Sequence, residues 1–234
     1  MARSKKIPTL STIIPTLNEE INLPLLLSDL NVWPHNLDLT IVDGGSTDST
    51  VSIAQVQGVN IIRSSNQSRG YQLNIGASNA KGDWMLFLHA DSRLDPSWVK
   101  SLFKIINDEK SKKFAWYFDF KIKKRHIQFR VLEIAVAIRS SFLQRPYGDQ
   151  GLLICKDLYN ITGGFSPLKI MEDLEFITRI TRTNKVRRIG ENLYTDDKKW
   201  NNSNIIDRAI KNAILRKKWR SGFDIDQLSK EYYS

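Results

Sequence analysis

The sequence predicts an α/β protein with a mostly parallel central sheet, helices on both faces of that sheet, and a helical extension at the C-terminal end. Residues 10–88 alternate strictly between strand-like and helix-like segments, which is the order of parallel βαβ units joined by right-handed crossovers. The strand-like segments are short apolar runs, as expected for strands covered on both faces. Basic residues become frequent after residue 197. We therefore expect one domain at 1–200 and a basic amphipathic extension at 201–234, packed on or beside it.

The first half of the chain supplies four strands with helices between them. The strands are expected at 10–14, 39–42, 59–62 and 84–88, and the helices at 18–30, 49–56 and 71–80. Pro15 closes the first strand, and Asn18 is placed to cap the first helix, whose first turn would contain Glu19 and Glu20. Thr47 or Asp48 is expected to cap the second helix.

The alternation is less regular after Asp95-Pro96. Helices are expected at 97–107, 127–143, 171–183 and 205–219, and strands at 114–122, 152–155 and 186–189. The helix at 127–143 is almost uniformly apolar from Val131 to Ile138, apart from Glu133. A helix of this kind is usually buried, although it could face lipid.

The fourth strand ends abruptly in small and polar residues, His89-Ala90-Asp91-Ser92. In an open parallel sheet, ligands bind just beyond the carboxyl ends of the strands. A carboxylate there is placed to hold a divalent cation on a phosphate. The alternative is an ordinary turn, in which an Asp-Ser pair is common.

The composition limits the class of protein and its compartment. A single cysteine, Cys155, cannot form an internal disulfide and is expected to be a buried thiol, which fits a reducing compartment. The apolar stretches are too short to span a bilayer, and the N-terminal residues make a poor signal peptide. A cytoplasmic location is therefore expected.

The positive charge is concentrated near the C-terminal end. The net charge is +10, and residues 198–220 carry +7 of it. The helix expected at 205–219 has Ile206, Ile210 and Ile214 on one face and a basic fringe of Arg208, Lys211, Arg216, Lys217, Lys218 and Arg220. Such a helix suits an anionic membrane surface, which would make the protein peripheral at the inner face of the cytoplasmic membrane. Alternatively, its apolar face packs on the core.

Six stretches, taken in order, resemble the family 2 glycosyltransferases: IIPTLNEE, IVDGGSTDST, SRGYQLNIGASNAKGDWMLFLHADS, YGDQG, GGF and MEDLEF. More narrowly, they resemble the bacterial branch associated with radical-SAM and selenodomain proteins. The resemblance extends from about Thr9 to about Gly190. It implies the nucleotide-diphospho-sugar transferase fold, called GT-A. It also implies transfer of a hexosyl group from a UDP- or GDP-sugar to an acceptor hydroxyl, with inversion and with help from Mg²⁺ or Mn²⁺.

The resemblance also implies which residues bind the nucleotide-sugar. Pro15, Thr16 and Glu19 would lie at the base and ribose, Asp43 at the base edge, and Ser46 beside it. The remaining donor-binding candidates are Arg69, Gly70, Asn74, His89, Ala90 and Asp91. Arg69 suits bidentate contact with a phosphate. Simpler interpretations are a helix-dipole partner for Glu19, a turn residue for Asp43 and a solvated surface arginine for Arg69.

Asp91 occupies the last position of the DxD motif of the resembled family, which makes it the expected metal ligand. His89 stands where that motif has its first aspartate. Imidazole is a poor ligand for Mg²⁺ and a better one for transition ions. His89 could therefore contact the donor, ligate Mn²⁺ or pack at the strand end.

An inverting transfer needs a general base that takes the proton of the acceptor hydroxyl. By resemblance this base is Asp173, and Asp149, Gln150 and Glu172 lie on the acceptor or donor-sugar side. The alternative is that Glu172 and Asp173 are first-turn acids of a helix. The acceptor is expected to be a lipid-linked or small molecule.

Two other functions are compatible with parts of the sequence. A sugar-1-phosphate nucleotidyltransferase shares the fold, but it needs a glycine-rich basic loop after the first strand, where this chain has Pro15 to Glu20. A nucleic-acid binder would gather basic and aromatic residues on one surface. Here the charge lies in one terminal segment, so we expect no nucleic-acid partner.

Overall fold

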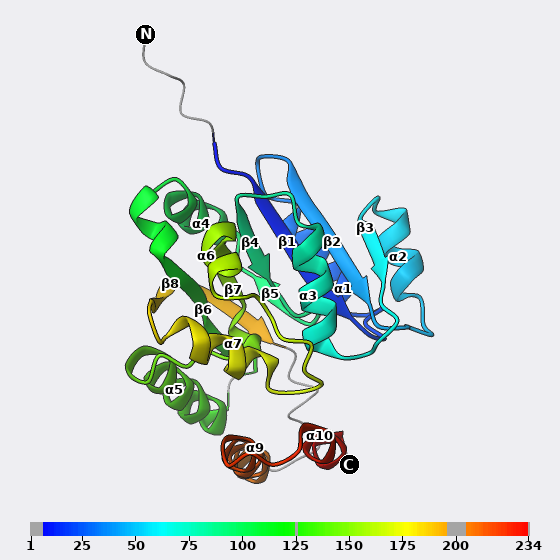
Figure 1. Cartoon of the computed structure of the whole chain (residues 1–234). Coiled ribbons are helices and arrows are strands. Elements are labelled where there is room, and N and C mark those ends of the chain that lie inside the picture. Colours follow the sequence, from blue (N-terminus) through cyan, green and yellow to red (C-terminus); the bar gives the residue numbers. More distant parts are fainter. Residues whose placement is uncertain (1–6, 125, 196–204, 234) are drawn as a thin grey trace.

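The computed structural model describes residues 7–124, 126–195 and 205–233. Its strands form one eight-stranded sheet in the order β3-β2-β1-β4-β7-β6-β8-β5, with helices against both faces (Figure 1). The strands are β1 (Leu10–Thr16), β2 (Leu37–Asp43), β3 (Asn60–Arg63), β4 (Trp84–Phe87), β5 (Arg93–Leu94), β6 (Phe114–Ile122), β7 (Leu152–Cys155) and β8 (Lys185–Thr195). The α/β class expected from the sequence is confirmed.

The first four strands are parallel, as the alternation predicted. β1 pairs with β2 and with β4, and β2 pairs with β3. Pro15 does not close β1 as expected but lies inside it, where it pairs with Val42 of β2. A proline is tolerated there because the pairing of β1 with β4 ends at Ile13, so no ladder bond is lost on that side.

The second half of the sheet is mixed. β7 pairs antiparallel with β4 and with β6, β6 pairs parallel with β8, and β5 pairs antiparallel with β8. β8 is longer than the strand expected at 186–189, because it follows β6 across an irregularity between Tyr117 and Asp119. β5 has two residues and was not predicted.

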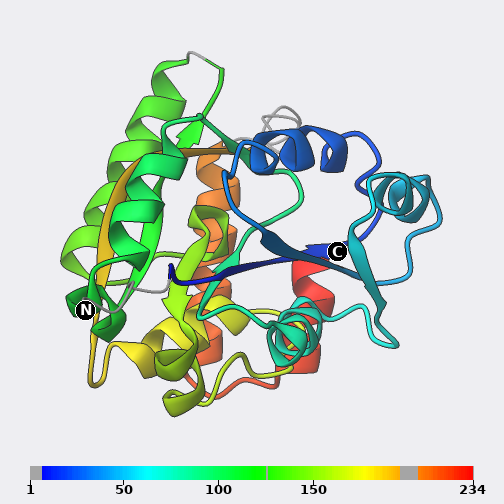
Figure 2. The same ribbon diagram turned by 90° about the horizontal axis from the view of Figure 1, so that it is seen from above.

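Helices cover the sheet on both sides, and successive residues of the central strands contact different helices. Leu10 and Ile14 pack with α1 (Leu23–Leu30) and α4 (Trp98–Ile106), whereas Ile13 packs with α3 (Arg69–Asn79) and α7 (Glu172–Ile180). Figure 2 shows α1 and α3 on opposite sides of the strands. Two further helices are α2 (Thr50–Val56) and α6 (Lys156–Ile161). Cys155 is buried in this core, as expected.

The start of α1 differs from the prediction. Asn18 does not cap this helix, which begins at Leu23 and has no acid in its first turn. Asn18 adopts a positive φ of 55° and joins two loops instead. Its backbone N–H donates to the Ser46 hydroxyl (2.9 Å), and its side-chain oxygen accepts from the Thr47 N–H (2.9 Å). These bonds compete with capping, as is common for asparagine.

Three helices lie at the lower end of the molecule in Figure 1: α5 (Ile127–Phe142), α9 (Ile205–Arg220) and α10 (Ile225–Tyr233). α5 buries Phe129 and Val136 against Phe120 and Ile122 of β6. The C-terminal pair packs on the body through a cluster of Ile170, Leu215 and Leu228. The domain boundary predicted at residue 200 lies outside the described residues. None of the helices in the described ranges is long and apolar enough to cross a membrane.

Candidate active site

The carboxyl ends of β1 and β2 carry five of the residues predicted to bind the nucleotide. These are Pro15, Thr16, Glu19, Asp43 and Ser46. The buried Asp43 carboxylate accepts hydrogen bonds from the Gly45 N–H (3.0 Å), the Ser46 N–H (3.1 Å) and the Ser46 hydroxyl (2.5 Å). Asp43 therefore organises the turn after β2. Glu19 precedes α1, so it is not a first-turn partner of the helix dipole; its carboxylate accepts from the Asn22 amide (2.9 Å).

Gln72, which the sequence did not indicate, fastens these two strand ends together. Its side-chain N–H₂ donates to the carbonyl of Thr16 (3.0 Å) and to the carbonyl of Val42 (2.7 Å). The side chain is buried, and a Cβ on Gly44 would lie 3.0 Å from its nitrogen. No sequence pattern around a glutamine within a helix indicates that its side chain will make such a contact.

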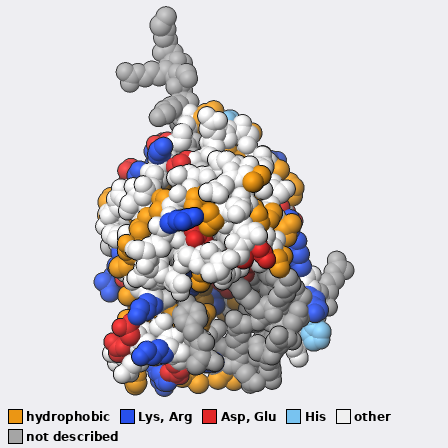
Figure 3. Space-filling model, turned by 90° about the vertical axis from the view of Figure 1, so that its right-hand side faces the viewer, with side chains coloured by type: hydrophobic (Ala, Val, Ile, Leu, Met, Phe, Trp, Pro, Cys, Tyr) orange, Lys and Arg blue, Asp and Glu red, His pale blue; other side chains and the backbone are white. Residues whose placement is uncertain are grey.

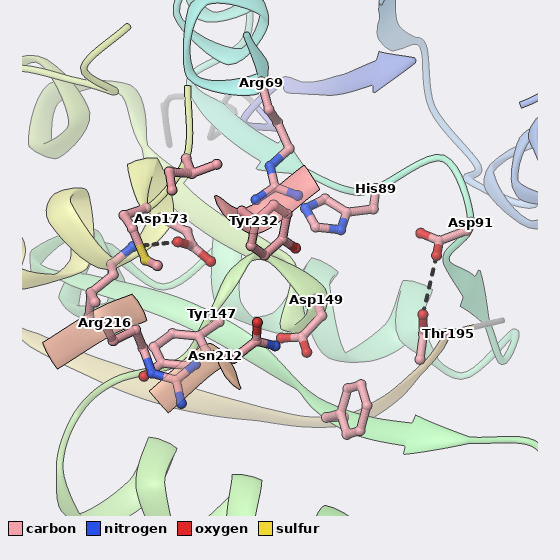
Figure 4. Close-up of a pocket in the computed structure, with 14 residues that line it drawn as sticks. Arg69, His89, Asp91, Tyr147, Asp149, Asp173, Thr195, Asn212, Arg216 and Tyr232 are labelled. Atoms are coloured by element: carbon pink, nitrogen blue, oxygen red, sulfur yellow. Dashed lines mark hydrogen bonds between the residues drawn. The ribbon is translucent and has the colours of Figure 1, made fainter. Parts of the chain in front are cut away.

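A second group of predicted residues lines a pocket where β4 ends (Figure 4). These are Arg69, His89, Asp91, Asp149 and Asp173. The pocket volume is about 190 Å³, below the roughly 300–1,000 Å³ of pockets that enclose a drug-sized ligand. It is large enough for part of a nucleotide-sugar but not for all of it. The first group thus lies at the carboxyl ends of β1 and β2, and the second group surrounds the carboxyl end of the neighbouring strand β4.

Asp173 is held rigidly at the start of α7. One carboxylate oxygen accepts from the Gly148 N–H (2.7 Å), and the other accepts from the N–H of Leu174 (2.6 Å). The preceding turn is fixed by Met171, which adopts a left-handed φ of 63°. Asp173 is a first-turn acid, as the alternative interpretation stated, but it also lines the pocket.

Asp149 has a carboxyl oxygen, Oδ1, that is buried and has no hydrogen-bond partner in the structure. Burial raises the pKa of this carboxyl; Arg139 opposes the rise, and the negative charge of Asp173 adds to it. An isolated buried carboxylate is costly, so the fold destabilises the ionised form of Asp149.

We expect Asp149→Asn to raise the melting temperature at pH 7.5. The pKa of Asp149 is higher in the folded state than in the unfolded state. The folded state therefore loses stability as the pH rises from the unfolded-state pKa through the folded-state pKa, and asparagine, which does not ionise, removes that loss. Each kcal/mol corresponds to roughly 2–4 °C for a chain of this size. The gain should shrink as the pH falls toward about 4, the ordinary range of an unfolded aspartate.

Thermal melts of both proteins from pH 4 to pH 8 check this expectation. Asp157→Asn is a suitable control, because Asp157 is an exposed acid in the first turn of α6. A melting difference that is independent of pH would contradict the assigned cause.

Glu172 is buried and forms an ion pair with Arg69, whose side chain is 37% exposed. Burial raises the pKa of Glu172, and the charge of Arg69 opposes this rise. Arg69 is therefore partly exposed but paired: it extends from the start of α3 to the start of α7 and lines the pocket. Its neighbour Gly70 has a packing role, because a Cβ there would come within 2.5 Å of the carbonyl oxygen of Ser166.

Three other predicted residues also lie outside the pocket lining. The Asn74 amide donates to the carbonyl of Phe165 (2.8 Å), and Ala90 is part of the core. Gln150 is buried, accepting from Ser140 (2.7 Å) and donating to the carbonyl of Phe118 (3.1 Å). These contacts position the loops around the pocket. Any direct contact of these residues with a donor remains a prediction.

His89 and Asp91 are the polar groups at the end of β4. The His89 ring packs against Gly148, where a Cβ would lie 2.8 Å from its Nε2. Asp91 is buried and accepts a hydrogen bond from the Thr195 hydroxyl (3.3 Å). No cluster of three metal-ligating side chains occurs in the part of the chain that the structure describes. One carboxylate fits a hard cation that takes its other ligands from phosphates and water.

The C-terminal helices contribute residues to the pocket that the sequence did not identify. Asn212 and Arg216 of α9 and Tyr232 of α10 line it. Two guanidinium groups lie near the Tyr147 ring, with Arg139 at 3.6 Å and Arg216 at 5.2 Å from the ring centre. The i, i+4 spacing of Asn212 and Arg216 places them on one helix face, but nothing local shows where that face docks.

Solved structures with the same architecture are glycosyltransferases. Glucosyl-3-phosphoglycerate synthase from Mycobacterium tuberculosis, in complex with Mn²⁺, UDP and phosphoglyceric acid, superposes with a TM-score of 0.63 at 18% identity, covering 93% of this chain and 80% of that one. The mannosyltransferase PcManGT from Pyrobaculum calidifontis, in complex with GDP-Man and Mn²⁺, gives 0.62 at 18% identity, with 80% and 57% covered. The fold is therefore that of the GT-A nucleotide-sugar transferases.

The sequence comparisons lead to a particular family. The model of "Glycosyl transferase family 2" matches residues 11–171, more than half of the chain. The chain belongs to this family.

Individual relatives match parts of the chain. A "PGL/p-HBAD biosynthesis glycosyltransferase" of Mycobacterium bovis is 39% identical over 94 residues, 37% of each protein. An "Uncharacterized glycosyltransferase" of Haemophilus influenzae is 27% identical over 182 residues, which are 73% of this chain and 61% of that protein. The chain thus spans less than two thirds of the length of either relative.

Proposed function

We propose that this protein is an inverting, metal-assisted glycosyltransferase that transfers a hexosyl group from a UDP- or GDP-sugar to an acceptor hydroxyl. The observation that carries the proposal is Asp173, whose carboxylate lines the pocket and is held by two backbone N–H groups. A base fixed in this way can take the proton of the acceptor hydroxyl as the hydroxyl oxygen attacks the anomeric carbon. The bond from that carbon to the diphosphate oxygen breaks, and the nucleoside diphosphate leaves.

The donor would extend along the edge of the sheet. The small volume of the pocket favours the sugar and the diphosphate inside it, with the nucleoside near Asp43, Ser46 and Glu19. A carboxylate can accept a hydrogen bond from the imide N–H of uracil, and likewise from the N–H groups of guanine. The similar structures named above hold UDP in one case and GDP-Man in the other, so both bases stay in the proposal.

Asp91 would hold the divalent cation on the diphosphate. When bound, Mg²⁺ or Mn²⁺ supplies positive charge that stabilises the leaving group. Thr195 orients the carboxylate through its hydroxyl. Arg69 and Arg216 line the same pocket and add positive charge near the phosphates. Glu172 positions Arg69 through their ion pair.

We expect Arg216→Ala to weaken binding of the nucleoside diphosphate by roughly 10- to 100-fold. A hydrogen bond to a charged group is worth about 1.5–3 kcal/mol, which corresponds to this range. Lys217→Ala is a matched control, since Lys217 is the adjacent cation and is exposed. Titration calorimetry with UDP and GDP in the presence of Mn²⁺ measures both variants. Equal losses in the two variants would assign the effect to net charge rather than to the pocket.

A panel of nucleotides and nucleotide-sugars, with Mg²⁺ and with Mn²⁺, tests the proposal as a whole. A ligand at one hundred times its Kd stabilises the fold by about 2.7 kcal/mol, which a thermal shift detects. Slow metal-dependent hydrolysis of one nucleotide-sugar would support glycosyl transfer. Pyrophosphate-dependent exchange would instead support the sugar-1-phosphate nucleotidyltransferase.

The acceptor is proposed to be a lipid-linked or small molecule. The location is proposed to be cytoplasmic and peripheral at the membrane. The C-terminal helix was expected to bind an anionic membrane through Ile206, Ile210 and Ile214. Ile210 and Ile214 are about half exposed, while Leu215 is the buried residue among the α9 side chains described from Ile210 to Arg220. The Ile206 side chain lies outside the described residues. Membrane contact by α9 therefore stays a prediction.

A further inference from the structure

The outward face of α5 carries an apolar stripe along the length of the helix. Ile127, Val131, Ile134, Ile138 and Phe142 are 52–81% exposed, and their spacing of three or four residues places them in one stripe. Leu143, just after the helix, extends the stripe. The helix is 16 residues long, so the stripe runs for about 22–24 Å. Water-exposed helix faces normally carry charged residues, and a contiguous apolar patch marks an interaction site.

The one acid of α5 lies toward the body of the protein, and its two arginines are half-buried. Glu133 is buried, and Lys121 and Arg130 both pair with it, at 3.0 Å and 2.7 Å. Apart from the half-buried Arg130 and Arg139, the residues of α5 that face solvent are uncharged. By contrast, basic and acidic side chains both occur on the face shown in Figure 3.

Basic residues flank the stripe at its ends. Lys123 and Lys124 are exposed just before α5 begins, and the half-buried Arg145 follows its end. The one acid of the helix, Glu133, is paired with two cations. The surroundings of the stripe are therefore positive. This combination of an apolar stripe and a basic border fits the headgroup region of an anionic bilayer.

We propose that α5 docks on an anionic membrane surface, with its stripe in the headgroup region and its axis in the membrane plane. The helix lies on the outside of the molecule in both ribbon views (Figures 1 and 2). The helix is too short to span a bilayer, and its inner face packs on β6. A lipid surface covers the outer face without requiring any change in the fold.

A second copy of the chain fits this surface less well than a membrane does. A two-fold interface brings the same patch together from both copies. The basic border of one copy would then face the basic border of the other, since both ends of α5 are flanked by cations. Like charges across an interface are unfavourable, whereas an anionic leaflet complements them.

The docking would place the candidate active site near the membrane. Arg139 of α5 stacks on Tyr147, which lines the pocket, at 3.6 Å. The C-terminal end of the stripe is therefore one residue contact away from the pocket. If the proposed glycosyl transfer holds, this arrangement selects a lipid-linked acceptor, and that consequence rests on the proposed function. The docking itself does not.

Vesicle sedimentation tests the docking with the full chain and no nucleotide. We compare Ile134→Asp/Ile138→Asp with Val56→Asp/Ile161→Asp, since Val56 (88% exposed) and Ile161 (83% exposed) are apolar surface residues of α2 and α6. The wild type and the control should bind phosphatidylglycerol-containing vesicles, bind phosphatidylcholine vesicles less, and be released by salt. The α5 variant should lose at least tenfold in partitioning. Binding of the α5 variant equal to wild type, or an equal loss in the control, would overturn the proposal.

A labelling experiment keeps the proposal testable if the double variant does not fold. Cys155 is buried, so a cysteine introduced as Ile138→Cys or Ile161→Cys takes an environment-sensitive fluorophore selectively. Emission from position 138 should shift to the blue on adding anionic vesicles, while emission from position 161 should not. A dimer in solution that the α5 variant converts to a monomer would instead assign the stripe to self-association and refute membrane docking. Donor hydrolysis, measured without vesicles, tests the proposed function separately.

Discussion

Asp173→Asn should lower turnover by roughly 10²- to 10⁴-fold while leaving donor binding near normal. This is the usual contribution of a positioned general base. Asparagine keeps the shape of the side chain and its carbonyl oxygen, so one backbone N–H can still be satisfied. It cannot take a proton from the acceptor hydroxyl. Single-turnover assays with the acceptor, together with calorimetric donor titration, separate the two effects.

Asp157→Asn provides the matched control for this substitution. Both aspartates lie in the first turn of a helix, but Asp157 is exposed on α6 and does not line the pocket. A loss of helix-dipole energy would affect both variants alike. If turnover of the Asp173 variant stays within a few-fold of wild type, Asp173 is structural and the base lies elsewhere.

Asp91→Ala should abolish metal-dependent binding of a nucleoside diphosphate while the fold survives. Asp91 is the buried carboxylate at the end of β4, and without it the cation loses the carboxylate that directly follows this strand. Thermal shifts with UDP and GDP, each with and without Mn²⁺, measure the metal-dependent part directly. The metal-independent part, which depends on the β1 and β2 ends, should persist.

Asp38→Ala is the control for the metal experiment. Asp38 lies near the amino end of β2, away from the carboxyl ends that carry the site, and accepts hydrogen bonds from the Ser11 hydroxyl (2.5 Å) and from the Lys81 N–H (2.9 Å). Its loss removes a carboxylate with structural hydrogen bonds but leaves the pocket intact. If the Asp91 variant binds the nucleoside diphosphate with unchanged metal-dependent affinity, Asp91 is not the metal ligand.

The parallel half of the fold could be predicted from the sequence because its signals are local. Each strand between residues 10 and 88 is a short apolar run followed by a helix of its own. The insertion of β7 between β4 and β6 could not be predicted, since the pairing of Trp84 with Cys155 joins residues far apart in the chain. β5, with two residues, and α6, with six, are too short to show periodicity.

The residues of the candidate site that belong to short sequence motifs were predicted. The residues that reach the site through the packing of the C-terminal helices were missed. Asp91, Asp149 and Asp173 do line one pocket. Their motifs had placed Asp91 at a strand end and Asp173 at a helix start. Arg216 and Tyr232 were missed, because no local sequence pattern indicates that α9 and α10 pack beside these motifs. Conversely, Gly70 belongs to a motif but serves close packing, which only the tertiary structure reveals.

The position of β4 has a consequence for the order in which the molecule folds. The pairings of β1 with β2 and of β2 with β3 join strands that follow closely in the chain, whereas both pairings of β4, with β1 and with β7, join residues far apart in the chain. Contacts between distant residues form late, because the chain entropy lost in closing the loop comes before their stabilisation. In refolding, we expect the strand ends at Thr16 and Asp43 to form first and the pocket at β4 and β7 to be completed last. A refolding chain would then regain nucleoside recognition before it regains catalysis.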